Sequence, residues 1–433
     1  MSSSINIGIA GLGTIGCGVV NNLLRNQESL KEKYGLDFEI IGVSASNKTK
    51  KRSINLEDFN WYDDPIDLAK DKNIDLVIEL VGGEKGIAYD LAIETINNKK
   101  GFITANKALL STNGKILSEL SCKNNVFFGY EAAVAGGIPI IKTLKSGLFL
   151  DKINNIFGIL NGTSNYILSR MNSANKSFED ALSEAQELGY AEADPSFDIN
   201  GMDAAHKLSI LSSMCFGQKI DFDHVKIQGI KAIELDDIRA ASDYGYTIRL
   251  LGIAKKNKDV HISQVVIPSL LSKESDLAGI EWEKNAVTIR GNYFKELLIS
   301  GPGAGRYPTA SAIMGDLFDI INNTNYPPLG IPLKALSKSS NEMNIETSRF
   351  YLRLLLPDIS GTMASITNVM AKNGISIDDI TQRISKKMKD KIINNKKNNH
   401  HFMYLMINPN DFVWWLREAV IPFYYNTIGF HGI

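Results

Sequence analysis

The sequence predicts an α/β protein in three parts: a doubly wound parallel sheet, a second α+β part with a mixed sheet, and a small C-terminal βαββαβ part. Three observations support this fold class. Up to residue 130, short apolar runs alternate with segments of helical period. After the stretch 189–207, strands no longer alternate strictly with helices, as in a mixed sheet. From residue 350 the order is strand, helix, two strands, helix and strand, which is the ferredoxin-like arrangement.

The first strand leads into a glycine-rich turn. Ile5–Ala10 is apolar enough for a buried parallel strand, and GLGTIG (residues 11–16) follows before a helical pattern. Gly11 permits the tight turn, Gly13 lets a diphosphate approach the backbone, and Gly16 lets the helix pack closely. A diphosphate would then bind at the helix N-terminus, beside Thr14 and Ile15. This pattern predicts a Rossmann-type dinucleotide site; the alternative is a glycine-rich turn without a ligand.

The second strand, Phe38–Val43, indicates which dinucleotide is bound. An NAD-selective site would place Asp or Glu at its end, but the chain continues Ser-Ala-Ser-Asn. Four cations follow: Lys48, Lys50, Lys51 and Arg52. This favours the 2′-phosphate of NADP, with NAD as the alternative, although a basic solvated loop would look the same.

Polar residues follow later strands of the same sheet. Further strands are expected at 75–81, 101–104 and 126–130, with helices at 86–97 and 108–122. Ligands bind at the carboxyl ends of such strands. Thr104 ends one strand, and Lys107 could reach cofactor or substrate, or lie in water at a helix start. Glu131 and the turn AAVAGGIP end the next; oxygen ligands there could hold a small cation, although an ordinary turn is the simpler interpretation.

The middle part contains strands of less regular spacing. A helix at 139–148 precedes a strand at 153–160, and the polar turn NGTSNY (161–166) opens a helix that runs to residue 171. Amides and hydroxyls in such a turn suit a small polar ligand. Strands are expected at 229–233, 247–255, 261–267 and 286–290, and GPGAG (301–305) precedes a helix at 309–321. Its glycines could approach a cofactor, or form a flexible turn.

The stretch GYAEADPSFDINGMDAAHK (189–207) is the most unusual one. It is too acidic and irregular for an ordinary helix or strand, and a helix is expected to begin near Gly201. Asp203 and Lys207 are four residues apart and would share a face of that helix. A surface ion pair is one interpretation. A substrate pocket is the other.

The C-terminal part is expected to contain strands at 350–356, 375–384, 402–407 and 424–430 and helices at 362–373 and 411–420. Residues 386–399 are rich in Lys and Asn and read as a long mobile loop.

Composition excludes several classes of protein. The chain has 433 residues, 44% of them hydrophobic, and a net charge of −1. That charge does not favour nucleic acid or an anionic membrane. Three separated cysteines suggest neither a disulfide framework nor a zinc site. With no signal peptide and no apolar run long enough for a membrane span, a soluble cytoplasmic protein is expected.

The motifs together resemble homoserine dehydrogenase, in the bacterial form with a C-terminal ACT domain. The most specific match is the central stretch, from Ala185 through the GYAEADP motif and Asp198 to Lys207. GLGTIG, the ANK of residues 105–107, EAAVAGGIP, NGTSNYIL and GPGAG also match. The resemblance covers nearly the whole chain and makes the surface-pair interpretation the weaker one.

The resemblance implies reversible NAD(P)-dependent oxidoreduction between L-homoserine and L-aspartate 4-semialdehyde, a step of threonine, methionine and isoleucine biosynthesis. Lys207 would be the proton donor or acceptor, Glu192 would hold the amino group, and Asp203 would help bind homoserine. The other implied substrate contacts are Lys107, Gly162, Thr163, Tyr190 and Asp198. The implied cofactor contacts are Gly11, Gly13, Thr14, Ile15, Gly16, Thr104, Lys107, Gly189 and Gly305. A sodium ion would be bound by Glu131 and by the backbone oxygens of Val134, Gly136 and Ile138.

The same resemblance implies a domain organisation. It places an NAD(P)-binding domain at 1–135, a catalytic and dimerisation domain at 136–300, a segment returning to the cofactor site and dimer interface at 301–330, a linker at 331–348 and an ACT-like regulatory domain at 349–433. ACT domains pair and bind amino acids, here near residues 358–361, which implies inhibition by L-threonine in a homodimer or homotetramer. Two segments depart from the family pattern: the Lys/Asn-rich insert 386–399, and the aromatic C-terminal end with Trp414, Trp415, Phe423, Tyr424 and Tyr425. A purely structural ACT domain is therefore the alternative. Two other functions stay open: a dehydrogenase for another amino-acid semialdehyde, and a non-catalytic amino-acid sensor.

Overall fold

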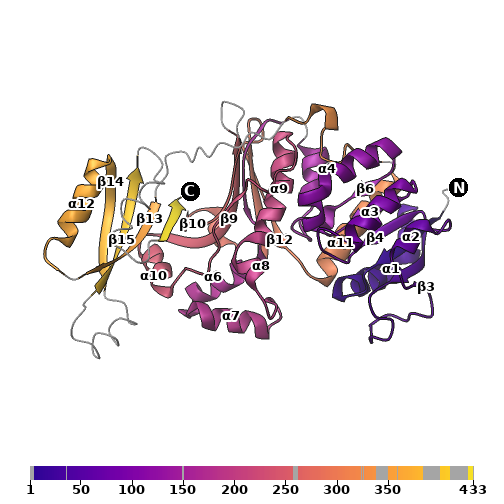
Figure 1. Ribbon diagram of the computed structural model, residues 1–433, viewed down its shortest axis with the longest axis horizontal. Coiled ribbons are helices and arrows are strands. Elements are labelled where there is room, and N and C mark those ends of the chain that lie inside the picture. The colour runs from indigo at the N-terminus through magenta and orange to yellow at the C-terminus, as the bar shows by residue number, and fades with distance from the viewer. Residues whose placement is uncertain are drawn as a thin grey trace.

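The computed structural model describes residues 4–35, 37–148, 151–256, 262–322, 324, 326–337, 350–357, 359–383, 400–409 and 428–432. Figure 1 shows three parts in a row: the N-terminal part at one end, the middle part beside it, and the C-terminal part at the other end. The predicted loop 386–399, the predicted helix 411–420 and most of the predicted linker lie outside the described residues.

The N-terminal sheet confirms the doubly wound prediction. Its order is β3-β2-β1-β4-β5-β6, and every pair is parallel. The strands are β1 (Ile5–Ala10), β2 (Phe38–Ser44), β3 (Asn60–Tyr62), β4 (Leu76–Glu79), β5 (Gly101–Thr104) and β6 (Phe128–Gly129). The helices are α1 (Thr14–Tyr34), α2 (Ile66–Lys70), α3 (Ile87–Asn97) and α4 (Lys107–Asn124). β3 and α2 were not predicted.

The N-terminal part is completed by a late segment of the chain. After β12 (Glu296–Pro302), helix α11 (Arg306–Ile321) returns and packs against α1. Ala310, Ile313 and Leu317 join the same buried cluster as Val19 and Val20. This contact brings the glycine-rich turn before α11 next to the dinucleotide turn.

The middle part contains a mixed sheet covered by helices. Its strand order is β12-β11-β7-β9-β10, with β8 beside β10. The other strands are β7 (Ile153–Ile159), β8 (Lys226–Ile227), β9 (Tyr246–Lys256), β10 (Ile262–Ser272) and β11 (Lys284–Gly291). The helices are α5 (Ile140–Lys142), which continues as a π-helical turn Thr143–Gly147, then α6 (Gly162–Ala174), α7 (Phe178–Glu187), α8 (Ser196–Ile199), α9 (Met202–Phe216) and α10 (Leu235–Asp243). Single 3₁₀ turns lie at Glu131–Ala133, Asp276–Gly279 and Leu333–Ala335.

The predicted strand at 229–233 is wrong. The chain turns back over α8 there, because the Ile230 N–H donates to the Ile199 oxygen at 2.8 Å. A Cβ at Gly229 would lie 2.2 Å from that oxygen, so the position accommodates only glycine. The pairing strand is instead the shorter β8, two residues earlier.

The C-terminal part has the predicted ferredoxin-like order. β13 (Phe350–Pro357), α12 (Thr362–Lys372), β14 (Ile375–Arg383), β15 (His400–Pro409) and β16 (Ile428–Gly432) form an antiparallel sheet ordered β16-β13-β15-β14. β16 also pairs in parallel with β10, so the middle and C-terminal sheets are continuous. α12 covers one face, with Ile366 and Met370 buried.

A buried ion pair joins the C-terminal part to the middle part. Arg353 of β13 donates to the Asp237 carboxylate of α10 at 2.7 Å, and the Tyr351 hydroxyl donates to its other oxygen at 2.8 Å. Asp237, Arg353 and Tyr351 are all at least 98% buried. The two parts are therefore connected by a charged contact as well as by the shared sheet.

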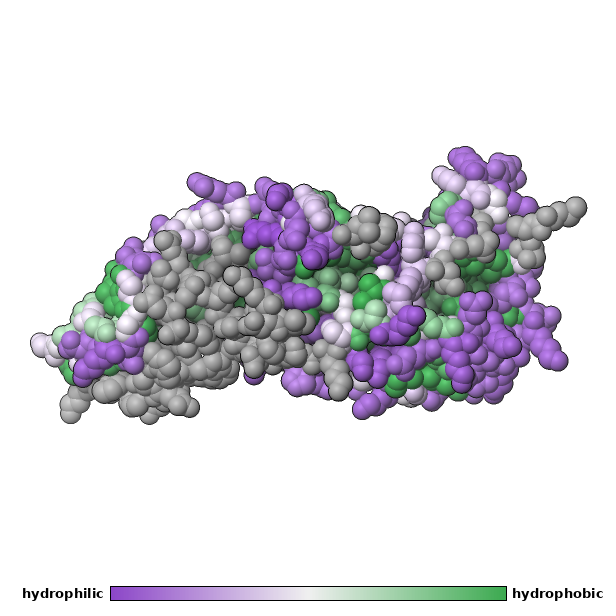
Figure 2. Space-filling model, turned by 90° about the horizontal axis from the view of Figure 1, so that it is seen from above, coloured by the Kyte–Doolittle hydropathy of each residue, from purple (hydrophilic) through white to green (hydrophobic). Residues whose placement is uncertain are grey.

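No helix among the described residues is long and apolar enough to cross a membrane. Figure 2 shows hydrophilic residues over much of the visible surface at the N-terminal end, with hydrophobic residues in patches between them.

Candidate active site

The dinucleotide turn has the geometry that its glycines predict. Gly11 has a φ of +100°, and a Cβ there would lie 2.5 Å from the Leu80 oxygen. A Cβ on Gly16 would lie 1.8 Å from the Gly11 oxygen, so α1 could not pack closely with any larger residue. No heavy atom lies within 4 Å of a Cβ built on Gly13. The open side of the turn is therefore where a diphosphate could meet the backbone.

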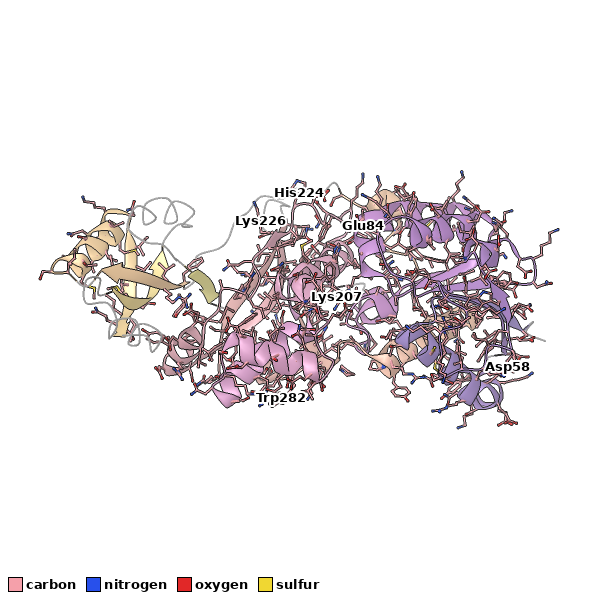
Figure 3. All side chains as sticks on the ribbon, turned by 60° about the horizontal axis from the view of Figure 1, so that its bottom comes forward. Asp58, Glu84, Lys207, His224, Lys226 and Trp282 are labelled. Atoms are coloured by element: carbon pink, nitrogen blue, oxygen red, sulfur yellow. The ribbon has the colours of Figure 1, made fainter. Side chains whose placement is uncertain are left out.

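A cavity of about 250 Å³ lies between the N-terminal and middle parts. It brings together four of the predicted residues, namely Ile15, Lys107, Lys207 and Gly305. Its remaining lining comes from residues 80–82, 105–106, 132–133, 135, 303–304 and 309. Figure 3 shows Lys207 where the ribbons of the two parts meet. The cavity thus joins the predicted cofactor and substrate sites.

Asp203 and Lys207 form a buried ion pair rather than a surface one. Gly201, with a φ of +85°, ends the preceding loop and starts α9. Asp203 then lies in the first helical turn, where the helix dipole favours a negative charge. Its Oδ2 lies 2.8 Å from Lys207 Nζ, and the two side chains are only 4% and 9% exposed. The surface interpretation of this spacing is wrong.

The second oxygen of Asp203 binds the second predicted lysine. Lys107, at the start of α4, places its Nζ 2.8 Å from Asp203 Oδ1. α4 belongs to the N-terminal part and α9 to the middle part, so this contact crosses the cavity. Asp203 in this structure holds both lysines in place; its predicted contact with homoserine stays a prediction.

The two lysines differ in their pKa values. Burial lowers the pKa of Lys207, and the Lys107 cation lowers it further, against the effect of Asp203. Burial lowers the pKa of Lys107 as well, but the nearby carboxylates outweigh it, Asp203 first and then Asp198 and Glu192, so the pKa of Lys107 is raised. Burial would raise the pKa of Asp203, yet the two ammonium groups hold it well below its ordinary value. The cluster therefore has one lysine that keeps its proton and one that gives it up more easily.

Two asparagines that were not predicted as site residues support the cluster. Asn161 caps α6 through Ser164 N–H, and its Nδ2 donates to Asp198 at 2.7 Å and to Asp203 at 2.8 Å. Asn285 Nδ2 donates at 3.0 Å to the Leu160 oxygen. That oxygen also accepts a bond of 2.7 Å from Lys207. The polar turn NGTSNY signalled Asn161, whereas Asn285 has no local signal in β11.

The other predicted substrate residues surround the same helix ends. The Thr163 hydroxyl donates to the Tyr190 oxygen at 2.7 Å, which ties α6 to the loop before α8. Burial and then the Asp203 charge raise the pKa of Asp198. Glu192 is exposed, and its charge helps to raise the pKa of Lys107.

Two predicted glycines lie in this region with different surroundings. Gly189 has a φ of +77° with open space around it. A Cβ on Gly162 would lie 2.5 Å from the Glu283 oxygen, so only glycine fits there. The substrate roles of both residues stay predictions.

The end of β5 is shaped by a buried acid that was not predicted. Glu79 ends β4 and accepts the N–H groups of Val81 and Gly82 at 2.7 and 2.9 Å. The Thr104 hydroxyl donates to Glu79 and accepts the Asn106 N–H. Thr104 thus positions the loop that lines the cavity; whether it also contacts a cofactor stays a prediction.

The predicted sodium ligands lie in one buried loop. Both carboxylate oxygens of Glu131 accept backbone N–H groups, from Ile141 at 3.0 Å and Lys142 at 2.8 Å. Burial raises the pKa of Glu131 to about 7. Val134, Gly136 and Ile138 are buried beside it. No group of three or more His, Cys, Asp or Glu side chains able to hold a metal ion occurs among the described residues.

Comparison with known proteins shows the family of the chain. Residues 11–131 match the family model "Homoserine dehydrogenase, NAD binding domain", residues 139–318 match "Homoserine dehydrogenase", and residues 350–394 match the ACT domain. A homoserine dehydrogenase of Helicobacter pylori is 41% identical over 385 residues, which are 88% of this chain and 89% of that protein. One of Neisseria gonorrhoeae is 39% identical over 88% of each chain.

Solved structures agree with the sequence relatives. A homoserine dehydrogenase from Thiobacillus denitrificans superimposes with a TM-score of 0.87 and 34% identity, over 100% of this chain and 98% of the other. The Staphylococcus aureus homoserine dehydrogenase at pH 6.5 gives a TM-score of 0.78 and 29% identity, over 100% and 99%. The chain therefore belongs to the homoserine dehydrogenases, and it carries a C-terminal ACT domain.

Proposed function

We propose that Lys207 gives and takes the proton in the reversible interconversion of L-homoserine and L-aspartate 4-semialdehyde. The observation that carries this proposal is the position of Lys207, which lines the cavity while its Nζ is held by Asp203 and the Leu160 oxygen; burial there lowers its pKa. An ammonium group has three N–H donors. Two of them are used, on the Leu160 oxygen and on Asp203, and the third is available for a substrate oxygen.

The bound nicotinamide dinucleotide supplies or accepts the hydride. In reduction, Lys207 gives a proton to the aldehyde oxygen as negative charge develops there. In homoserine oxidation, neutral Lys207 takes the hydroxyl proton, and its lowered pKa increases the neutral fraction. Lys107 stays charged and would hold the substrate close to the cofactor, with Glu192 on the amino group and Asp203 orienting both lysines. Replacement of Lys207 by Ala, with turnover and cofactor binding both measured, tests this assignment.

We also propose NADP as the preferred dinucleotide. Arg52 Nε donates to the Leu12 oxygen of the dinucleotide turn at 3.2 Å, which places its cation beside the end of β2. Arg52 and Lys48 both lie 5.7 Å from the Trp61 ring. Two cations, and no acid in residues 45–48 directly after β2, suit a 2′-phosphate. Replacing Arg52 by Gln should raise KM for NADP more than KM for NAD.

A sodium ion at the Glu131 loop is a further proposal. Its donor set consists of oxygens only, which suits a hard cation. Each carboxylate oxygen of Glu131 has used one lone pair on a backbone N–H and keeps another. The proposal predicts that NaCl raises the melting temperature more than choline chloride at equal ionic strength. It predicts no such difference for Glu131→Gln.

The ACT domain suggests regulation by an amino acid, and we propose L-threonine as the inhibitor. The turn before α12 is exposed at Ile359, and Gly361 has a φ of +94°. Inhibition of homoserine oxidation by added L-threonine tests this; an unaffected rate at saturating threonine would leave the domain a structural role.

We further propose a homodimer or homotetramer, testable by light scattering. All three cysteines are free thiols, which supports a reducing cytoplasm.

A further inference from the structure

His206 lies next to Lys207 on α9, but its ring turns toward α4. The ring is 96% buried, and Nδ1 is hydrogen-bonded to the Ser111 hydroxyl. Ser111 is four residues after Lys107 on α4, so both side chains lie on the face that meets α9. The two helices are therefore joined by two neighbouring contacts, Lys107 with Asp203 and Ser111 with His206.

The imidazole is also one layer of an aromatic column. Phe222 stacks on it with ring centroids 4.1 Å apart and an interplanar angle of 4°. Phe197 lies on it at 5.6 Å and 25°. The Lys107 ammonium lies 5.6 Å from the Phe197 ring, as a cation–π contact. His206 thus supports Lys107 twice, through Ser111 on the same helix and through the ring on which Lys107 rests.

We propose that His206 is a positioning residue for the reaction: its bond to Ser111 and its contact with Phe197 hold the Lys107 ammonium on Asp203, and so keep Asp203 shared between the two lysines. This inference rests on the proposed role of Lys207. It adds a residue that does not itself line the cavity and is not one of the proposed substrate contacts.

The charge state of His206 agrees with such a role. Burial lowers the pKa of His206, so the ring is neutral at neutral pH. The charged groups that act on it are Asp203, Lys107 and Glu84. A neutral ring adds no third cation to the cluster and can accept or donate toward Ser111.

The consequence is a measurable change at Lys207. The charged groups with the largest effects on Lys207 are Asp203, Lys107 and Asp198, and of these Lys107 is the one that lowers its pKa. If Lys107 moves away from Asp203, the pKa of Lys207 should rise. Homoserine oxidation needs neutral Lys207, so the oxidation rate should then rise only at a higher pH.

The experiment compares pH–rate profiles of homoserine oxidation in full-length variants. His206→Ala and Ser111→Ala should each lower kcat/KM by about tenfold, the effect of one hydrogen bond of about 1.4 kcal/mol. Both should move the profile to higher pH. His206→Asn keeps a polar atom near the Nδ1 position and should restore part of the loss. In a Lys107→Met background, His206→Ala should move the profile no further.

Ser213→Ala is the matched control. Ser213 is a fully buried serine on the same helix, and its hydroxyl donates to the Gln218 oxygen at 2.6 Å, away from the cluster. It should leave the profile unchanged. The inference is overturned if Ser111→Ala keeps the wild-type profile while Lys207→Ala is inactive. It is also overturned if His206→Ala shifts the profile equally with and without Lys107. Normal turnover of Lys207→Ala would instead overturn the proposed function itself.

Discussion

Asp203 Oδ2 lies 2.8 Å from Lys207 Nζ, one helical turn away, and less than a tenth of either side chain is exposed. Lys107 binds the other oxygen of the same carboxylate at 2.8 Å. One buried carboxylate between two ammonium groups leaves the cluster with one excess positive charge. That excess favours release of a proton, and the more deeply buried Lys207 is the group that releases it.

The first prediction is that two neutral substitutions shift the pH–rate profile in opposite directions. Asp203→Asn removes the charge that raises the pKa of Lys207. The rate of homoserine oxidation, which increases with pH, should therefore begin to increase at a lower pH than in the wild type. Lys107→Met removes the cation that lowers this pKa, so the rise should occur at higher pH. Each shift should be on the order of one pH unit. Initial rates across a pH series measure both.

The reverse reaction provides an internal check on these signs. Reduction needs protonated Lys207, so the rate of reduction should fall as the pH rises. In each variant, the pH at which this fall occurs should move in the same direction as the pH at which the oxidation rate rises. Shifts of equal sign in Asp203→Asn and Lys107→Met would contradict the assignment. Both variants should also lose activity, on the order of a hundredfold in kcat/KM, because the substrate is no longer held in place.

The second prediction separates folding from cofactor binding in the dinucleotide turn. Gly13 has a φ of −74° and open space where a Cβ would lie. Gly13→Ala should therefore change the free energy of unfolding by less than about 0.5 kcal/mol. The added methyl group would occupy the space where the diphosphate approaches, so KM for the cofactor should rise by about tenfold or more.

Gly16→Ala is the contrasting variant. Its Cβ would overlap the Gly11 oxygen, so it should lower the free energy of unfolding by roughly 1–3 kcal/mol. Urea unfolding and cofactor titration distinguish the two substitutions. A destabilised Gly13→Ala with an unchanged cofactor KM would be inconsistent with a ligand at this turn.

The third prediction concerns the buried pair between the middle and C-terminal parts. Arg353→Ala leaves the Asp237 carboxylate buried without its guanidinium partner and should cost roughly 3–5 kcal/mol of stability. Tyr351→Phe removes only one neutral donor from the same carboxylate and should cost about 1 kcal/mol. Urea unfolding of the full chain measures both. Equal, small effects would mean that the ion pair does not hold the two parts together.

Local patterns in the sequence predicted the elements with strong periodicity. β1 begins and ends at the predicted residues, because an apolar run bounded by a glycine turn has few alternatives. The Asp203–Lys207 pair followed from its spacing on one helix. What the spacing could not decide was burial, which depends on α4 and on the sheet packed against α9.

Contacts between distant segments had no local signal. The pairing of Ser269 with His431 joins two sheets, and neither strand indicates its partner. Asn285 and Ser111 reach the site from a strand and a helix whose patterns read as ordinary core elements. The wrong strand at 229–233 has the same cause, since its backbone is directed by the Ile199 oxygen of a short helix.

The central claim is that Lys207 carries the proton, and one kinetic comparison tests it most directly. Lys207→Ala and wild type are assayed for homoserine oxidation, while cofactor binding is titrated for both by nicotinamide fluorescence. We expect the variant to bind the cofactor with unchanged affinity and to lose turnover by at least about a thousandfold. Turnover within tenfold of wild type, with the cofactor bound normally, would contradict the claim.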